Sequence, residues 1–221
     1  MFAEGELLRR ADALAGWSIA ELAARLQIPL PERPERAKGF VGRLLEEALG
    51  ATAGSRPEAD FPALGVELKT IPLDSQGKAR ESTFVTYASV DELCGSDWES
   101  SRVRHKLARV LWIPIEARPG LTFSERRIGI PLLWSPNAAQ EELLRADWER
   151  LSEALIAGEA GDVRGNVGQV LQLRPKAARA EVRSLQWDAE GFASLAQPKA
   201  FYLRAPFTTS IFAAANPIGG Q

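Results

Sequence analysis

Two carboxylates and one lysine stand close together in the segment DFPALGVELKT, which begins at Asp60. The stretch FPALG after Asp60 contains a proline and a glycine and is typical of a turn, and a strand-like run follows it. Alternation along that run places Val66 and Leu68 on one face of the strand and Glu67 and Lys69 on the other. We therefore expect the apolar pair to anchor a core and the turn to fold Asp60 back beside the polar pair.

Carboxylate oxygens and an ammonium group that meet at one point suit the hydrolysis of a phosphodiester. Mg²⁺ prefers oxygen ligands and is often held by one or two carboxylates together with substrate phosphate. A lysine can polarise a water molecule or stabilise negative charge that develops on the phosphate. The same D…ExK spacing also occurs on the solvent-exposed face of a half-buried strand. The spacing alone therefore leaves both interpretations open.

The composition is that of an ordinary soluble protein. A chain of 221 residues is long enough for one sizeable core, in one domain or in one domain with two lobes. No apolar run approaches the roughly 20 residues of a membrane span, and the N-terminus has no signal-peptide core, so we expect a cytoplasmic protein. The single cysteine, Cys94, and the single histidine, His105, exclude an internal disulfide and offer no zinc site. Both are expected to be structural.

The charge distribution is more informative than the net charge of −2, which gives no support to nucleic-acid binding. Basic residues gather in the two runs SRVRHKLARV and LRPKAARAEVR. Such runs form either a track for DNA phosphates or the solvated face of an element. Their members are Arg102, Arg104, Lys106 and Arg109 in the first run and Arg174, Lys176, Arg179 and Arg183 in the second.

Helices are predicted near the N-terminus and in the second half of the chain. A capping box of Ser18 and Glu21 marks one helix start, Gly50 ends a third helix, and Asn137 caps the clearest helix of all. The predicted helices cover residues 6–16, 18–28, 39–51 and 137–158, and a helical turn or two is expected at 208–215.

Strands are predicted in short runs that are rich in β-branched and aromatic residues and bounded by proline and glycine. Three tryptophans, Trp112, Trp134 and Trp148, lie in apolar contexts and are expected to belong to the core. Together with the helices, these runs predict an α/β domain with helices packed on a central sheet. The predicted strands cover residues 65–73, 82–90, 109–117, 127–135, 168–176 and 200–207.

The sequence resembles the MutH family, the strand-discriminating endonucleases of methyl-directed DNA mismatch repair in the restriction-endonuclease-like PD-(D/E)xK superfamily. The similar segments run in order along nearly the whole chain: KGFVGRLLEEALGATAGSRPEADFPALGVELKTIPLDSQGKARESTFV, SRVRHKLARVLWIPIEA, RRIGIPLLWSPN, LQLRPKAARA and FYLRAPFTTS. Such long colinear matches are far more specific than one degenerate triad, so they favour the catalytic interpretation of the D…ExK spacing.

The resemblance implies a restriction-endonuclease-like α/β fold, in which a central mixed β-sheet is flanked by helices and two lobes surround a DNA-binding cleft. We expect a single domain over residues 1–221. Its N-terminal lobe would carry the catalytic motif and its C-terminal lobe the DNA-reading loops.

By the same resemblance, Asp60, Glu67 and Lys69 match the catalytic triad of the family, and Glu46 matches an acidic residue that completes the site. Asp60 and Glu67 would hold Mg²⁺, with the Leu68 carbonyl as a further ligand because it lies between the two functional side chains. Lys69 would orient or help to deprotonate the attacking water. For Glu46 the alternative is a glutamate on a helix surface.

The resemblance also assigns contacts to DNA. Lys106 matches a position that the family keeps basic near the active site, and it is expected to contact the scissile phosphate. An arginine or lysine can donate to guanine O6 and N7, and a tyrosine hydroxyl beside the adenine amino group could sense a methyl group there. For the RPKA segment the alternative is a simple turn at a strand end. The residues that match the family's DNA-facing loops are Lys38, Gly39, Arg174, Pro175, Lys176 and Tyr202.

The function implied by the resemblance is that of a monomeric, Mg²⁺-dependent endonuclease. It would nick the unmethylated strand of double-stranded DNA at a hemimethylated GATC site, 5′ to the G. MutL would activate it after MutS has found a mismatch, and it would have no membrane partner. Two alternatives are a GATC-specific restriction endonuclease that cuts both strands and a DNA-binding module that has lost catalysis. The joint presence of Asp60, Glu67 and Lys69 argues against the second alternative.

Overall fold

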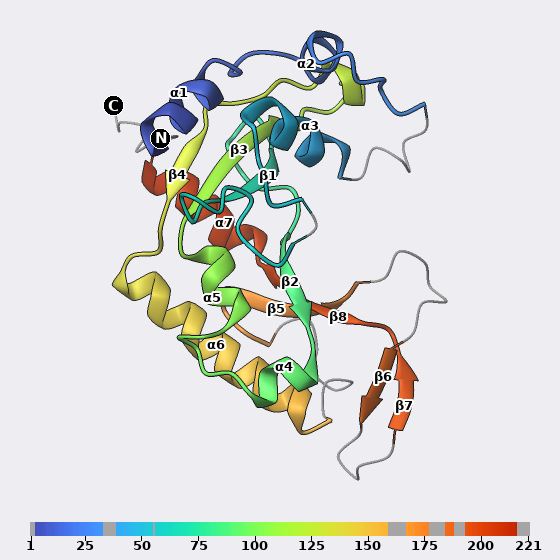
Figure 1. The fold of residues 1–221 in the computed structure, drawn as a ribbon, viewed down its shortest axis with the longest axis vertical. Coiled ribbons are helices and arrows are strands. Elements are labelled where there is room, and N and C mark those ends of the chain that lie inside the picture. Colours follow the sequence, from blue (N-terminus) through green and yellow to red (C-terminus); the bar gives the residue numbers. More distant parts are fainter. Residues whose placement is uncertain are drawn as a thin grey trace. The chain divides into compact units, whose positions relative to one another are not determined.

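The computed structural model describes residues 3–32, 39–54, 56–158, 167–176, 184–187 and 193–215. Helices and strands are interspersed along the chain, which confirms the predicted α/β class (Figure 1). None of the helices in these ranges is long and apolar enough to cross a membrane. The single two-lobed domain over residues 1–221 stays a prediction. Two compact units are present: unit 1 comprises Met1–Glu81, Ala108–Ser135 and Thr209–Gln221, and unit 2 comprises Ser82–Leu107 and Pro136–Thr208.

Unit 1 begins with the three predicted helices, which are confirmed. The capping box at the second helix is present, because Glu21 N–H donates to Ser18 Oγ at 3.1 Å and Ser18 N–H donates to Glu21 Oε2 at 2.7 Å. The third helix lies between Gly39 (φ 76°) and Gly50 (φ 79°), in the left-handed region that glycine adopts without steric cost. The helices are α1 (Glu4–Asp12), α2 (Ile19–Arg25) and α3 (Phe40–Leu49).

The sheet of unit 1 is mixed and has the order β1-β3-β4. Strand β1 (Glu67–Leu73) runs parallel to β3 (Val110–Glu116), which pairs antiparallel with β4 (Leu132–Trp134). The prediction of one continuous strand over 127–135 is wrong in its first part. There Gly129 N–H donates to the Pro114 carbonyl at 2.7 Å, and a Cβ atom at Gly129 would lie 2.9 Å from the Pro114 side chain. This close approach, together with Pro131, interrupts a regular ladder.

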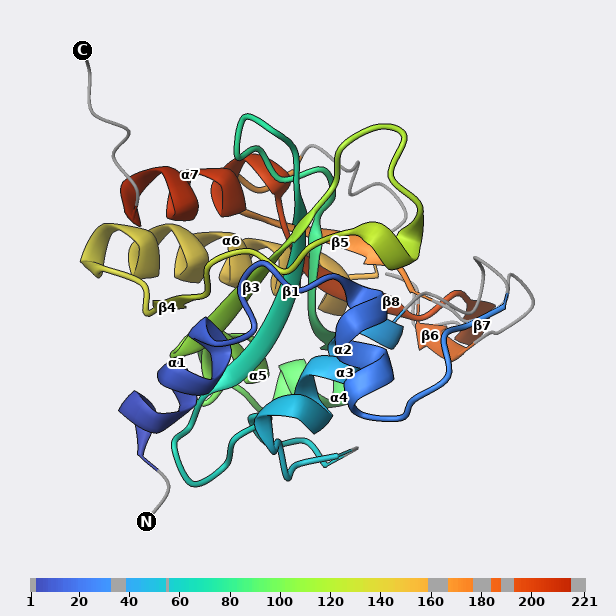
Figure 2. The ribbon, with the colours of Figure 1, turned by 90° about the horizontal axis from the view of Figure 1, so that it is seen from above.

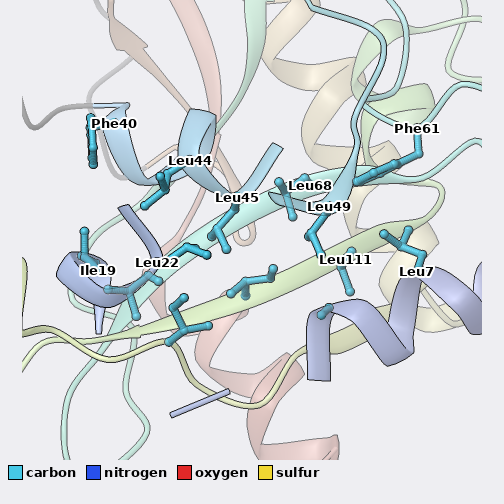
Figure 3. Close-up of a cluster of buried hydrophobic side chains, with 14 of the residues drawn as sticks. Leu7, Ile19, Leu22, Phe40, Leu44, Leu45, Leu49, Phe61, Leu68 and Leu111 are labelled. Atoms are coloured by element: carbon cyan, nitrogen blue, oxygen red, sulfur yellow. The ribbon is translucent and has the colours of Figure 1, made fainter. Parts of the chain in front are cut away.

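Both faces of this sheet are covered (Figure 2). The 3-10 helix η2 (Phe123–Glu125) adds to the helix side through an edge contact between Phe123 and Phe40. On the opposite face, the Trp112 ring centroid lies 6.2 Å from that of Phe212 in α7 (Ala205–Ala215). On the helix side, α1, α2 and α3 pack against β1 and β3 through a buried cluster that includes Leu7, Ile19, Leu22, Leu44, Leu45, Leu49, Leu68 and Leu111 (Figure 3).

Unit 2 contains an antiparallel sheet in which β8 (Lys199–Leu203) lies between β2 (Thr83–Ala88) and β5 (Leu171–Pro175). Its longest helix begins at the predicted cap, because Gln140 N–H donates to Asn137 Oδ1 at 2.9 Å. The remaining elements of unit 2 are α4 (Val90–Cys94), α5 (Arg102–Leu107), α6 (Ala138–Ile156) and a separate hairpin of β6 (Ser184–Trp187) and β7 (Ala193–Ala196).

The strand predicted over 200–207 is shorter than expected, since β8 ends at Leu203 and α7 begins at Ala205. Pro206 lies in the first turn of α7, where its missing N–H removes no helical hydrogen bond. The helix has 11 residues and is longer than the turn or two that the sequence predicted.

The predicted core positions of the three tryptophans are confirmed. Trp112, Trp134 and Trp148 are all buried, as expected of core residues. Cys94 and His105, which the sequence assigned to structural positions, are both exposed, and Cys94 is a free thiol.

Candidate active site and DNA-reading face

A tight turn places Asp60 beside the start of β1. Phe61 N–H donates to the Val66 carbonyl at 2.9 Å, and Gly65 allows the turn with φ 64°. The Asp60 carboxylate then accepts a hydrogen bond from Leu68 N–H at 2.8 Å. The structure thus has the fold-back that the FPALG stretch predicts.

The main chain of β1 directs one more oxygen toward Asp60. Glu67 N–H points to β3, where it donates to the Arg109 carbonyl at 2.9 Å, whereas Leu68 N–H points the other way, to Asp60. In an extended strand the N–H and C=O groups of one residue point to the same side. The Leu68 carbonyl therefore faces the same strand edge as the Asp60 carboxylate.

Glu67 and Lys69 form a buried ion pair. Lys69 Nζ lies 3.1 Å from Glu67 Oε1, and the side chains are only 7% and 8% exposed, respectively. Lys69 is opposite Trp112 in the parallel ladder, so the pair belongs to the sheet face on which Trp112 packs against Phe212. This burial excludes the interpretation of the ExK spacing as a solvent-exposed face. Buried charges are tolerated when they are paired, and here each partner neutralises the other.

The oxygen donors at this strand end fit a hard divalent cation. They are the carboxylates of Asp60 and Glu67 and the carbonyl of Leu68, the ligand type that Mg²⁺ prefers. Within the described ranges, no three or more His, Cys, Asp or Glu side chains are gathered where they could hold a metal ion. Half-buried Glu46 on α3 is thus not combined with Asp60 and Glu67 into one such cluster.

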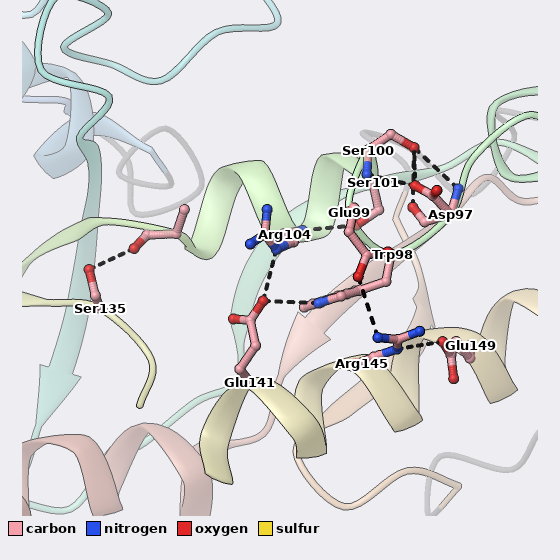
Figure 4. A network of polar contacts seen from close by, with 11 residues as sticks. Asp97, Trp98, Glu99, Ser100, Ser101, Arg104, Ser135, Glu141, Arg145 and Glu149 are labelled. Atoms are coloured by element: carbon pink, nitrogen blue, oxygen red, sulfur yellow. Dashed lines mark hydrogen bonds and ion pairs between the residues drawn. The ribbon is translucent and has the colours of Figure 1, made fainter. Parts of the chain in front are cut away.

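The first basic run is largely neutralised by acidic partners. Lys106 is half-buried on α5 of unit 2, and its contact to the scissile phosphate stays a prediction. Its arginine neighbours form ion pairs with glutamates (Figure 4 shows the pair of Arg104). The pairs are Arg102 with Glu92 at 3.2 Å, Arg104 with Glu141 at 2.8 Å and Arg109 with Glu4 at 2.6 Å.

Cations and aromatic rings gather on one face of the β2-β8-β5 sheet. The Arg174 guanidinium lies 5.7 Å from the ring centroid of Tyr202. Lys176 Nζ lies 4.5 Å from the ring centroid of Phe84 and 6.0 Å from that of Tyr202. Cations over ring faces at such distances are attracted by the quadrupole of the ring. The structure therefore brings together three of the predicted DNA-reading residues, while Pro175 is exposed at the end of β5.

Phe84 is a member of this face that sequence reasoning missed. It lies opposite Tyr202 in the ladder of β2 and β8, and the two rings make an edge contact with centroids 5.7 Å apart. The pattern of residues 82–90 predicted the strand, but nothing in it shows which residue of β8 stands opposite Phe84. The opposing position is set by a β-bulge between Phe84 and Thr86.

A buried carboxylate fixes the start of β5 and so the place of its reading residues. The Asp147 carboxylate accepts hydrogen bonds from the N–H groups of Gln169, Val170 and Leu171 at 2.9, 2.6 and 2.8 Å. Gly168 next to them has φ 89°, and a Cβ atom there would lie 2.3 Å from the Leu171 carbonyl oxygen. Only glycine fits this position.

Burial also shifts the pKa of two groups on β8. It raises the pKa of the Tyr202 phenol above its ordinary value, an effect that the Arg174 guanidinium opposes and Tyr87 reinforces. Burial lowers the pKa of Lys199. Tyr202 is therefore a neutral phenol at physiological pH.

Two further residues with predicted DNA contacts, Lys38 and Gly39, precede α3 in the sequence. Gly39 is exposed at the N-terminus of that helix, whose positive end suits an anion such as a phosphate. Lys38 lies outside the described residues, as do Arg179 and Arg183 of the second basic run.

Comparison with known proteins identifies the family. The family model for the DNA mismatch repair enzyme MutH matches residues 49–147, a range that contains the Asp60 turn and the Glu67–Lys69 pair. A DNA mismatch repair protein MutH from Pectobacterium atrosepticum is 51% identical over 210 residues, which are 95% of this chain and 91% of the relative. The corresponding protein of Serratia proteamaculans is 50% identical over 95% of this chain and 92% of the relative.

The chain belongs to the MutH family. This confirms the resemblance inferred from the sequence and, with it, the restriction-endonuclease-like fold class. A MutH protein of Yersinia pestis is 49% identical over the same share of the chain, so the similarity extends well beyond the matched family model. Family membership alone does not assign the roles of individual residues, which depend on the geometry of the site.

Proposed function

We propose that this MutH-family protein nicks the unmethylated strand of DNA at hemimethylated GATC sites during mismatch repair, with Mg²⁺ as its cofactor. Its class, a DNA mismatch repair endonuclease, follows from family membership. The observation that carries the proposed mechanism is the buried Glu67–Lys69 pair at 3.1 Å, next to a carboxylate that the Asp60 turn holds against the same strand.

The oxygens of Asp60, Glu67 and Leu68 would hold the cation, which when bound supplies a Lewis acid for the scissile phosphate. The Lys69 ammonium, fixed on a rigid strand, would orient the attacking water and stabilise negative charge on the phosphate oxygens. The water oxygen bonds to phosphorus as the water gives a proton to the solvent, and the P–O3′ bond breaks as the leaving O3′ takes a proton from the solvent. The products are a 5′-phosphate and a 3′-hydroxyl. Glu46 would support the cation site from α3.

Unit 2 would supply the reading of GATC. Arg174 and Lys176 are suited to donate to guanine O6 and N7, with Pro175 between them at the end of β5. The Tyr202 hydroxyl, which is neutral at pH 7, would lie beside the adenine amino group and detect a methyl group there. Phosphate contacts are assigned to Lys106, Lys38 and Gly39.

The proposal includes the partners and the location of the protein. With a net charge of −2 and all three arginines of its first basic run already paired, the chain should bind DNA weakly alone. Weak binding agrees with recruitment and activation by MutL after MutS has found a mismatch. We propose a monomer that acts in the cytoplasm.

A nicking assay tests the proposal. Duplexes with an unmethylated, hemimethylated or fully methylated GATC site are incubated with the protein and Mg²⁺, with and without MutL, and each strand is labelled separately. Nicks confined to unmethylated strands and stimulated by MutL are expected. Cleavage of both strands at fully methylated sites would instead indicate a restriction endonuclease, and binding without any cleavage would indicate a DNA-binding module.

A further inference from the structure

The bulge in β2 turns a second aromatic residue of that strand toward the reading face, which is the face of the β2-β8-β5 sheet that carries Arg174, Lys176 and Tyr202. Phe84 and Tyr87 are three positions apart, so a regular strand would place them on opposite faces. The bulge shifts the register: Phe84 stands opposite Tyr202, and Tyr87 stands opposite Ala200. Because Tyr202 and Ala200 are two positions apart on β8, their side chains share a face. Phe84 and Tyr87 therefore share it as well.

The strand pairing arranges this face in two rows. In one row Tyr202 has Phe84 on one side and Gln172 on the other, and in the next row Ala200 has Tyr87 on one side and Arg174 on the other. Alanine is small, and the larger residues Tyr87 and Arg174 lie on either side of it. The row of Tyr87 thus adjoins the row that contains the proposed methyl sensor.

Tyr87 is exposed and yet held in place. The residue is 51% exposed, which is unusual for a large aromatic side chain, and its ring packs edge-on against Phe84 with centroids 5.5 Å apart. Within the described ranges, no hydrogen bond is found for the Tyr87 hydroxyl. A ring fixed by one edge, with a solvated hydroxyl at its far end, is suited to contact a polar partner outside the protein.

We propose that the Tyr87 hydroxyl donates a hydrogen bond to a backbone phosphate of the DNA beside the recognised site. This inference depends on the proposed function, because the partner is the same DNA. The choice of DNA as partner follows from the face itself, on which Arg174 and Lys176 supply two cations among the aromatic rings.

A phosphate is a better match than a base for a residue at this place. Tyr202 is on the central strand β8, whereas Tyr87 is on the outer strand β2, about 5 Å to the side. If Tyr202 and the two cations at the end of β5 meet base edges in a groove, a side chain on β2, on the other side of β8, meets the rim of that groove, where the phosphates lie. Tyr87 would then position the duplex without reading its sequence.

Binding measurements test the proposal with Tyr87→Phe, which keeps the ring and removes only the hydroxyl. Duplexes with and without GATC are titrated in Ca²⁺ at several salt concentrations. We expect binding weaker by about 10-fold or more on both duplexes, because one hydrogen bond to a charged phosphate oxygen is lost. The dependence on salt should not change, since a hydroxyl neutralises no phosphate charge, whereas Lys106→Ala, which removes a proposed phosphate contact, should lower the slope by about one.

Ile156→Ala serves as the matched control, because Ile156 is an exposed apolar residue on α6 of the same unit. It should bind like the wild type. Wild-type affinity for Tyr87→Phe would overturn the proposal, and so would a loss restricted to particular flanking sequences, which would indicate a base contact.

A second readout observes the contact directly. The chain has only two tyrosines, Tyr87 and Tyr202, so protein labelled with 3-fluorotyrosine gives two ¹⁹F resonances, and Tyr87→Phe assigns them. Both resonances should shift when GATC duplex is added. A shift of the Tyr202 resonance alone overturns the inference about Tyr87 but leaves the proposed function intact. A wild-type protein that neither binds nor nicks GATC duplex refutes the proposed function itself.

Discussion

The proposed catalytic site on β1 and the reading face of the β2-β8-β5 sheet differ in both burial and charge. On β1, Glu67 and Lys69 have opposite charges and are more than nine-tenths buried. On the face of the β2-β8-β5 sheet, Arg174 and Lys176 have the same charge, and they lie over aromatic rings that are still partly open to solvent. The first region pairs its two charges inside one unit, and the second places two cations beside partly exposed aromatic rings.

This difference indicates what each region must do. A reacting group benefits from a fixed position and from exclusion of water, since charge interactions strengthen where the surroundings polarise less. A reading group must reach a partner that approaches from solvent, so it must stay exposed. An aromatic ring restrains the motion of a cation that lies above it and still leaves the cation accessible to solvent. Substitutions should therefore affect the two regions in different ways.

The largest difference is expected in the chemical step. Lys69→Met and Glu67→Gln keep the side-chain size but remove the charge, and each should reduce the nicking rate by about 10²- to 10⁴-fold. DNA binding in Ca²⁺ should remain measurable, because the phosphate contacts are untouched. Single-turnover nicking in Mg²⁺ and binding titrations provide the two measurements. Robust Mg²⁺-dependent cleavage by either variant would show that the active site has been assigned to the wrong residues.

The next largest effect concerns stability. Lys69→Met leaves the Glu67 carboxylate buried without its partner, which should lower the free energy of unfolding by about 3 kcal/mol. The double variant Glu67→Gln/Lys69→Met removes both charges and should recover much of this loss. Urea denaturation of the single and double variants measures the coupling. Arg145→Met, which breaks exposed pairs with Glu149 and Glu99, is the control and should change stability by less than about 1 kcal/mol.

The outcomes on β1 show what a sequence can predict about such a site. Alternation correctly separated Val66 and Leu68 from Glu67 and Lys69, because the period of a strand is a local property. The burial of the polar pair was not predictable in this way. It depends on what covers that face of the sheet, and the contact there comes from Phe212, which lies more than a hundred positions along the chain.

The reading face shows a second limit of prediction from the sequence, which is the orientation of side chains that depends on strand pairing. Arg174, Lys176 and Tyr202 were found through resemblance to a family, whereas Phe84 and Tyr87 were missed. Their common orientation depends on a single extra residue in β2, and only the pairing with β8 reveals it. Likewise, the residues 204–207 have a strand-like composition, and only the structure shows that the helix α7 begins among them.

A smaller effect is expected for discrimination between strands. A methyl group on the adenine amino nitrogen removes one donor and adds bulk, so a close-fitting Tyr202 should disfavour it by about 1 to 3 kcal/mol. Tyr202→Ala should therefore cut the two strands of a hemimethylated duplex at more nearly equal rates. Lys176→Ala should lose activity on both strands, because base recognition itself weakens. Strand-specific nicking rates provide the test, and an unchanged ratio in Tyr202→Ala would locate the methyl sensor elsewhere.

The smallest expected effect is a shift in the titration of Tyr202, and it tests whether the cations and rings of the reading face form one electrostatic unit. In Tyr87→Phe, Tyr202 is the sole tyrosine, so the absorbance of its phenolate is read without interference. Burial should keep its pKa above the ordinary value, and adding Arg174→Ala should raise that pKa further, because the guanidinium favours the phenolate.

The same pKa shift predicts a pH dependence of stability. A phenol whose pKa is higher in the folded state contributes stability that is fully present below the ordinary value near 10 and is lost as the pH rises through the folded value. The free energy of unfolding should therefore fall less steeply above pH 10 in Tyr202→Phe than in the wild type. If the pKa of Tyr202 instead falls when Arg174 is removed, the guanidinium does not face the Tyr202 hydroxyl. Lys176 would then be the only one of the two cations that interacts with Tyr202.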